Sequence, residues 1–226
     1  ALVLSVLQSA TIIQIFQRVL LALLEQNWQN SMETLTFDER LFLLLNFDGG
    51  VVTDHIMSAV SGYVMWIPLY LFILVAVQRK YGWKSLGLFI LCLALAMGIA
   101  DMLCGIFKHT GLLKGLLPDF PVRHRPMFDI NVRELAHVVS YHHGPYGTVS
   151  AHAATNAALA LLSALVIRDR GYNIAIVVIT LLVSYSRIYL ACHFPQDIVL
   201  GLAVGAISGW MMYLLWRKLD ILLKNS

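Results

Sequence analysis

Long apolar runs without acidic or basic residues, separated by short polar stretches, dominate the chain from residue 56 onward. Two of them, Leu86–Ala100 and Ile174–Ser186, are short and reach the length of a membrane-spanning helix only by including Asp101 and Arg187. A helix needs roughly 20 residues to cross a hydrocarbon layer of about 30 Å, so the other three span it unaided. These three are Ile56–Val77, Thr148–Ile167 and Ile198–Trp216. The pattern predicts an all-α integral membrane bundle of five core transmembrane helices.

Two segments before these runs have a different pattern. Ala1–Leu24 is apolar but contains three glutamines and one arginine. Three interpretations remain open: it is a sixth spanning helix, it lies on the membrane surface, or it is foreign to the natural protein, with Ser31 to Thr34 as a junction. The segment Phe37–Phe47 is amphipathic and predicts an interfacial helix. The chain therefore divides into an N-terminal apolar helix over residues 1–31 and one membrane domain over residues 32–226.

The composition agrees with this pattern. Of the 226 residues, 59% are hydrophobic and 13% are charged, and the mean hydropathy is +0.74. These values exclude an ordinary soluble domain. The net charge of +3 says little about function, and no nucleic-acid partner is expected. Gly201, Gly205 and Gly209 repeat every four residues, which favours close helix packing within one chain, although nothing in the sequence fixes the oligomeric state.

The parity of the predicted helices sorts the polar segments onto two faces. One face receives residues 78–85, residues 168–173 and the tail from Arg217, which carry most of the short-loop basic residues. The other receives residues 108–147, the start of the run at Thr148 and the segment 187–197. The positive-inside rule makes the first face cytoplasmic. The basic residues of the second face are nearly as many, but a binding site for an anion would explain them.

Three motifs with chemically useful side chains fall on that second face. They are Arg123-His124-Arg125-Pro126, Ser150-Ala151-His152, and a set formed by Ser186-Arg187, His193 and Asp197. His193 and Asp197 are four residues apart, so they meet on one side of a helical turn if Pro195 opens the next helix. A carboxylate in that place fixes the imidazole tautomer and makes the free nitrogen a better nucleophile.

Together these motifs resemble the phosphatidic acid phosphatase type 2 superfamily, whose signature is KxxxxxxRP, PSGH and SRxxxxxHxxxD. The third motif matches at every fixed position, and the second is met by Ser150 and His152 only. The first keeps Arg125-Pro126, but Pro118 stands where the family has lysine. We take Lys114 as the substitute, with Lys108 as the alternative. The resemblance covers about residues 101–201.

The resemblance implies a membrane lipid phosphatase that needs neither a metal nor another cofactor. In it His193 attacks phosphorus and forms a phosphohistidine, Asp197 orients His193, and His152 protonates the leaving oxygen. Positive charge and hydrogen-bond donors suit the phosphate oxygens, and the residues assigned to them are Arg125, Arg187, Ser150 and Lys114. Candidate substrates are phosphatidate, phosphatidylglycerol phosphate, undecaprenyl diphosphate and lipid A phosphate. The loop 123–150 is similar to that of members from the Bacteroides group, which favours lipid A or undecaprenyl substrates and a bacterial inner membrane, with the active site facing the periplasm or exterior.

Other functions were weighed against this one. A lipid-to-lipid phosphotransferase would use the same intermediate, and a vanadium haloperoxidase would share the residues, although such relatives are mainly soluble. A transporter or channel would line its pathway with Arg187 and Asp101, but no inverted repeat is visible. His193 and Asp197 as zinc ligands lack a third ligand at standard spacing. Hydrogen-bonding or solvated roles are expected for the remaining histidines of the loop, and for Asp101 a lysine partner or a capping role.

Overall fold

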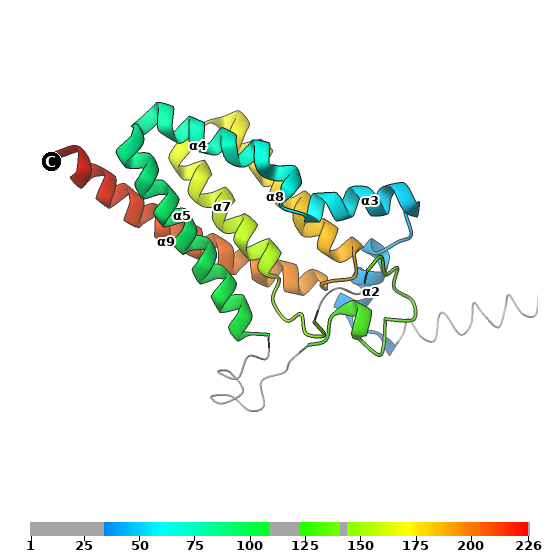
Figure 1. The fold of residues 1–226 in the computed structure, drawn as a ribbon. Helices are drawn as coiled ribbons and strands as arrows, with labels where there is room; N and C mark the ends of the chain where they lie inside the picture. The colour runs from blue at the N-terminus through cyan, green and yellow to red at the C-terminus, as the bar shows by residue number, and fades with distance from the viewer. Residues whose placement is uncertain (1–33, 109–122, 141–143, 226) are drawn as a thin grey trace, which may run out of the picture. The chain divides into compact units, whose positions relative to one another are not determined.

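The computed structural model describes residues 34–108, 123–140 and 144–225, and Figure 1 shows their arrangement. In this part of the chain the regular elements are helices, apart from one isolated β-bridge between His124 and Tyr146. The helices are α2 (Phe37–Leu45), α3 (Gly50–Ser61), η1 (Val64–Trp66), α4 (Ile67–Tyr81), α5 (Trp83–Ile106), η2 (Pro126–Phe128), α7 (Ala151–Ile167), α8 (Arg170–Tyr189) and α9 (Pro195–Asn225). The chain separates into two compact units, residues 1–40 and 41–226, and the description below concerns the second. Lys114, the run Ala1–Leu24 and the predicted boundary at residue 31 lie outside the described residues.

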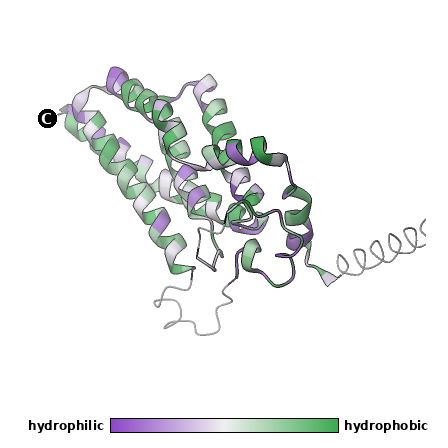
Figure 2. Cartoon of the chain, turned by 45° about the vertical axis from the view of Figure 1, so that its right-hand side comes forward, coloured by the Kyte–Doolittle hydropathy of each residue, from purple (hydrophilic) through white to green (hydrophobic). Residues whose placement is uncertain are grey.

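Among the described residues, four helical segments are long and apolar enough to cross a membrane by length and composition. They are Val64–Tyr81, Trp83–Ile106, Arg170–Tyr189 and Pro195–Lys224. The remaining predicted span, Thr148–Ile167, corresponds to α7, which is apolar but has only 17 residues. Many large apolar side chains on α4, α5, α8 and α9 are exposed, and hydrophobic colour predominates along the bundle in Figure 2. The prediction of an all-helical membrane protein is confirmed, and the predicted count of five spans is not.

The first predicted span was wrong in its boundaries. The run Ile56–Val77 is not one helix, because α3 ends at Ser61 and Gly62 is extended, with φ −79° and ψ 154°. The indole of Trp66 donates to the carbonyl of Val60 at 2.9 Å, which satisfies an acceptor left open by the end of α3. The next helix, α4, begins at Ile67 with a proline in its first turn. Hydropathy does not register this break, because every residue around it is apolar or small.

Helix α7 is central to the second unit and packs against α5, α8 and α9. Most of its alanines are buried, and the three glycines of α9 lie against its backbone. A Cβ added at Gly201 or Gly205 would overlap the carbonyl oxygens of Ser150 or Ala154, and one at Gly209 would lie 2.7 Å from that of Ala158. The predicted intramolecular use of the glycine repeat is therefore confirmed.

The two ends of the bundle have the residue content that helix parity predicts. At one end Lys80 Nζ donates to Ile167 O at 2.5 Å, and Arg168 donates to the Tyr213 hydroxyl at 2.6 Å. These contacts join the ends of α4, α7 and α9. At the opposite end lie the C-termini of α5 and α8 and the N-termini of α7 and α9 (Figure 1). The motif residues gather at this second end.

Candidate active site

His193 lies in a tight turn between α8 and α9. Ala191 is left-handed, with φ 52°, and the N–H groups of Cys192 and His193 both donate to Arg187 O, at 2.9 and 3.2 Å. Helix α9 begins at Pro195, as the sequence predicted. The turn therefore places His193 directly beside the C-terminus of α8, which carries Arg187.

The hydrogen bonds of His193 define its tautomer. The ring is 1% exposed, and its Nδ1 lies 2.9 Å from Gly147 O and 3.4 Å from Asp197 Oδ2. Both partners are acceptors, so Nδ1 carries the proton. The other nitrogen, Nε2, lies 3.3 Å from Arg125 NH1, a group that can only donate. Nε2 is therefore the unprotonated nitrogen, and its lone pair accepts from Arg125.

The electrostatic environment keeps the ring neutral. Burial lowers the pKa of His193 well below its ordinary value, and the nearby charges of Arg125, Arg187 and Lys108 lower it further. The hydrogen bond to Gly147 acts in the opposite direction and is the smaller effect. At neutral pH the imidazole is uncharged and can act as a nucleophile.

Asp197 holds the turn as well as the ring. Its Oδ2 accepts the N–H of Phe194 at 3.0 Å, and its Oδ1 lies 3.8 Å from Arg123 NH1. The guanidinium of Arg123 also covers the Phe194 ring, 3.6 Å from its centroid. The predicted meeting of His193 and Asp197 is found, but the closest acceptor for Nδ1 is a backbone carbonyl.

Arg125 reaches His193 from the loop before η2. Its N–H donates to Pro145 O at 2.8 Å, and NH1 also donates to Cys192 O at 3.2 Å. Gly147 makes this approach possible, because a Cβ there would lie 2.8 Å from Arg125 Cγ. Burial lowers the pKa of Arg125, but a guanidinium stays protonated in proteins. Its Nε is buried and has no hydrogen-bond partner among the described residues, so this donor is suited to an anion.

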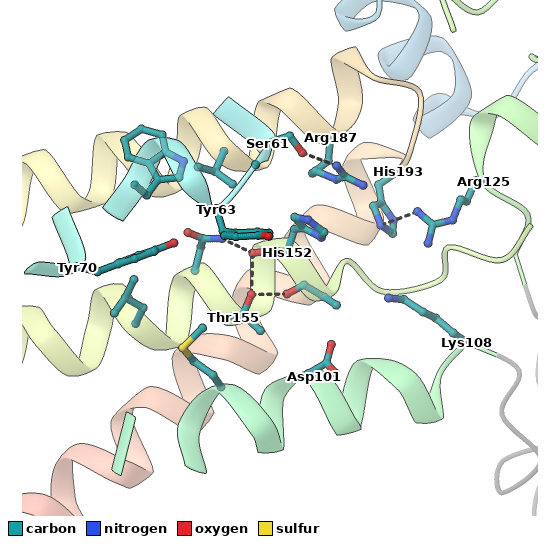
Figure 3. Close-up of a pocket in the computed structure, with 17 residues that line it drawn as sticks. Ser61, Tyr63, Tyr70, Asp101, Lys108, Arg125, His152, Thr155, Arg187 and His193 are labelled. Carbon is teal, nitrogen blue, oxygen red and sulfur yellow. Dashed lines mark hydrogen bonds between the residues drawn. The ribbon is translucent and has the colours of Figure 1, made fainter. Parts of the chain in front are cut away.

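A cavity of about 340 Å³ opens beside these groups. Figure 3 shows His193, Arg125, Arg187, Lys108 and His152 around it. Arg187 is 3% exposed and donates to the Ser61 hydroxyl at the end of α3. Burial and the charge of Arg125 lower the pKa of Lys108. One wall thus combines three cationic side chains with an imidazole nucleophile, which suits a phosphate group.

Two predicted residues stand behind the wall. Ser150 is fully buried, caps α7 by accepting from Ala153 N at 3.4 Å, and is not among the described residues that line the cavity. Asp197 is also absent from that lining and reaches the cavity through His193. The backbone N–H of Ser150 donates to Asp197 O at 3.0 Å, which ties the starts of α7 and α9 together.

Comparisons with known proteins agree with this geometry. Residues 89–220 match the PAP2 superfamily. This chain belongs to the PAP2 superfamily. It is 31% identical to a lipid A 4'-phosphatase of Bacteroides thetaiotaomicron, over 84% of this chain and 81% of that protein. It is 30% identical to a lipid A 4'-phosphatase of Porphyromonas gingivalis, over 79% of this chain and 72% of that protein.

A solved structure shows the same fold. The crystal structure of Aquifex aeolicus LpxE aligns with a TM-score of 0.52 and 21% identity, covering 80% of this chain and 96% of that one. The PAP2 membership and these relatives make the chain a phosphatase that hydrolyses a phosphomonoester, and a bacterial membrane protein.

The PAP2 motifs account for the three converging segments but not for everything around them. Among the described residues Lys108 lines the cavity, whereas Lys114 lies outside the described part of the chain. Ser61 and Gly147 were missed, since neither belongs to a predicted motif. Each becomes important through partners distant in sequence, Arg187 for Ser61, and Arg125 and His193 for Gly147.

A second polar cluster was also missed in this PAP2 protein. Asn46 Nδ2 donates to Tyr189 O at 2.7 Å and to Ile188 O at 3.1 Å, carbonyls freed by the end of α8. Asp54 accepts from the Tyr189 hydroxyl at 2.6 Å and lies 2.9 Å from His137 Nε2. The expected hydrogen-bonding role of His137 is confirmed. This cluster fixes the helix end that presents Arg187.

Proposed function

We propose that this PAP2 protein removes a phosphate from lipid A by metal-independent hydrolysis through a phosphohistidine on His193. The observation that carries the proposal is the state of His193: a neutral ring with Nδ1–H held by Gly147 and Asp197, and with Nε2 at a cationic cavity. The names of the two relatives support lipid A as the substrate.

In the first step the Nε2 lone pair forms a bond to phosphorus while the bond from phosphorus to the lipid oxygen breaks. His152 gives its proton to that leaving oxygen. Arg125 and Arg187, with Lys108 or Lys114, neutralise the charge on the phosphoryl oxygens as it passes through the transition state. Ser150 supports the site from its buried position by capping the start of α7, whose first turn borders the cavity.

In the second step His152 takes a proton from water, and the water oxygen attacks phosphorus. The bond between Nε2 and phosphorus breaks, its electron pair returns to the ring, and inorganic phosphate leaves. Asp197 and Gly147 hold the Nδ1 proton throughout, so His193 ends neutral. The cationic side chains neutralise the charge that metal ions neutralise in metal-dependent phosphatases.

Phosphate release from purified lipid A, with mass spectrometry of the product, tests this proposal. The wild-type protein should release phosphate equally well in EDTA, and His193→Ala should release none. His55→Ala is the matched control, because His55 is an exposed histidine on α3 that does not line the cavity. If the wild-type protein leaves lipid A intact, the proposed substrate is wrong. Activity in a folded His193→Ala protein would refute the assignment of His193 as the nucleophile. Activity that is lost in EDTA and restored by Mg²⁺ or Zn²⁺ would refute the metal-free mechanism.

A further inference from the structure

Helix α5 presents three chemically different residues to the cavity wall. Lys108 follows the end of the helix, Asp101 lies seven residues earlier, and Met97 lies four residues before Asp101. This spacing keeps all three on one face, over about 16 Å at 1.5 Å per residue. From the phosphate end inward, this wall is cationic, then anionic, then apolar. The phosphatase mechanism uses the cation and leaves the carboxylate of Asp101 without a role.

Helix α7 also changes from polar to apolar across the cavity. His152 comes first, Thr155 and Asn156 follow, and Leu159 is last. The Thr155 hydroxyl donates to Ala151 O and the Asn156 amide donates to His152 O, each at 2.9 Å. Both side chains keep oxygen lone pairs to offer a ligand, and the Asn156 amide keeps one further N–H. The middle of the cavity is therefore rich in hydrogen-bond acceptors, and Asp101 is the charged one (Figure 3).

Asp101 lies inside a membrane-spanning helix, where an ionised carboxylate is costly. No hydrogen bond or ion pair joins its carboxylate to the residues that the structure describes, so neither the lysine partner nor the cap expected from sequence is found there. A carboxylate kept in such a place, and lining an active cavity, is a candidate functional residue. Since it only accepts, the ligand group beside it must be a donor, such as a hydroxyl or an amide N–H.

An apolar groove of about 370 Å³ continues from the cavity. It lies between α4, α5 and α7 and shares Tyr63, Tyr70, Met97 and Leu159 with the cavity wall. The shared residues make the two spaces continuous, so one ligand can occupy both. A ligand that fits both spaces has a phosphate at the cations, a layer with hydrogen-bond donors at Asp101 and a hydrocarbon chain in the groove. An acylated sugar phosphate has these three parts in this order. A phosphoglyceride has ester carbonyls, which only accept, in the middle layer.

We infer that Asp101 determines specificity by accepting a hydrogen bond from a hydroxyl or amide N–H of the acylated sugar that carries the phosphate, while an acyl chain lies in the groove beyond it. This inference rests on the proposed lipid A substrate. It separates recognition of the sugar, which Asp101 performs, from phosphoryl transfer, which His193 performs. A site built to bond a donor rejects an analogue that lacks one.

The test compares lipid A with phosphatidate, a lipid phosphomonoester without such a donor, in the same detergent micelles. For Asp101→Leu and the isosteric Asp101→Asn, the ratio of kcat/KM on lipid A to that on phosphatidate should fall at least about tenfold, mainly through KM for lipid A. Asp169→Asn, which removes a carboxylate at the opposite end of the bundle, should leave the ratio unchanged.

An unchanged ratio in both folded Asp101 variants would overturn the inference, and so would equal losses on the two lipids, which would make Asp101 a general electrostatic residue. Both outcomes would leave the proposed function standing. A wild-type protein that hydrolyses phosphatidate but not lipid A would overturn the proposed substrate and this inference together.

Discussion

At the scale of single residues, the balance of burial and charge around His193 predicts a pH effect. Burial lowers the pKa of His193, and Arg125 adds to the lowering, so the reactive neutral form persists well below the ordinary pKa. Arg125→Gln removes one cation, so the folded-state pKa should rise and the acid limb of kcat/KM should move to higher pH. The rate at the optimum should also drop, by about 10²-fold or more. A pH profile of phosphate release measures both effects.

Arg125→Lys is the control, because it retains the charge and should leave the acid limb close to that of the wild type. The lowered pKa of His193 also affects folding stability. The unfolded chain binds a proton on His193 at a higher pH than the folded chain does. This residue therefore lowers the free energy of unfolding as the pH decreases through its ordinary pKa. If the acid limb of kcat/KM for Arg125→Gln moves to lower pH, the assignment of that limb to His193 beside Arg125 is wrong.

The two candidate lysines give a second prediction. Lys108 lines the cavity, and the pKa of its amine is lowered by burial and by Arg125, as expected for a cation placed beside other cations. Lys108→Ala should therefore reduce kcat/KM by about 10²-fold, since a charge contact in a partly dehydrated site is strong. Lys114→Ala serves as the comparison in the same assay. A larger loss in Lys114→Ala would restore the assignment made from sequence.

Sequence spacing predicted the core of the candidate site, because Arg187, His193 and Asp197 sit on one short stretch whose geometry is local. Arg125 and His152 were predicted from motif resemblance. Gly147, Ser61 and Asn46 were not predictable, since each acts through a contact more than 40 residues away in sequence: Gly147 with His193, Ser61 with Arg187, and Asn46 with Tyr189. The role of Asp101 was underestimated, because a lysine partner or a capping role was expected for its carboxylate.

At the scale of helices, the contact between α7 and α9 controls how His152 and Asp197 are held. A Cβ at Gly205 would overlap the Ala154 carbonyl, so Gly205→Ala should separate the two helices. Overpacking of this kind costs about 1–3 kcal/mol. The thermal unfolding midpoint in detergent should fall, and the rate of phosphate release should fall with it.

Gly98→Ala on α5 is the matched substitution, because a Cβ there meets nothing within 4 Å. It should be neutral or stabilising by about 0.5–1 kcal/mol, since alanine is a better helix former than glycine. Equal unfolding midpoints for the two variants would show that the glycine repeat of α9 does not set the distance between α7 and α9. The repeat itself was readable from sequence, whereas the break between α3 and α4 was not, because the residues around it are apolar or small and hydropathy does not register it.

At the scale of the whole molecule, helix parity alone assigned the motifs to one end of the bundle, and the contacts at both ends agree with it. Orientation in the membrane needs a further argument. Arg79, Lys80, Lys84, Arg168, Arg170, Arg217 and Lys218 lie near the ends of α4, α7 and α9 and the starts of α5 and α8, opposite His152 and His193. The positive-inside rule predicts that this end is cytoplasmic. The catalytic end, and the leaflet from which the substrate enters, would then face the periplasm.

Cysteine labelling on intact cells tests that orientation. Cys92, Cys104 and Cys192 are free and buried, and a variant without them provides the background. A cysteine in place of Glu134, which is exposed in the loop tied by His137 to the catalytic end, should react with a membrane-impermeant thiol reagent. One in place of Lys84, exposed at the start of α5, should react only after the cells are opened. Because the two positions lie on opposite ends of the same bundle, the reverse pattern would place the phosphatase site, with its Asp101 layer and acyl groove, in the cytoplasmic leaflet.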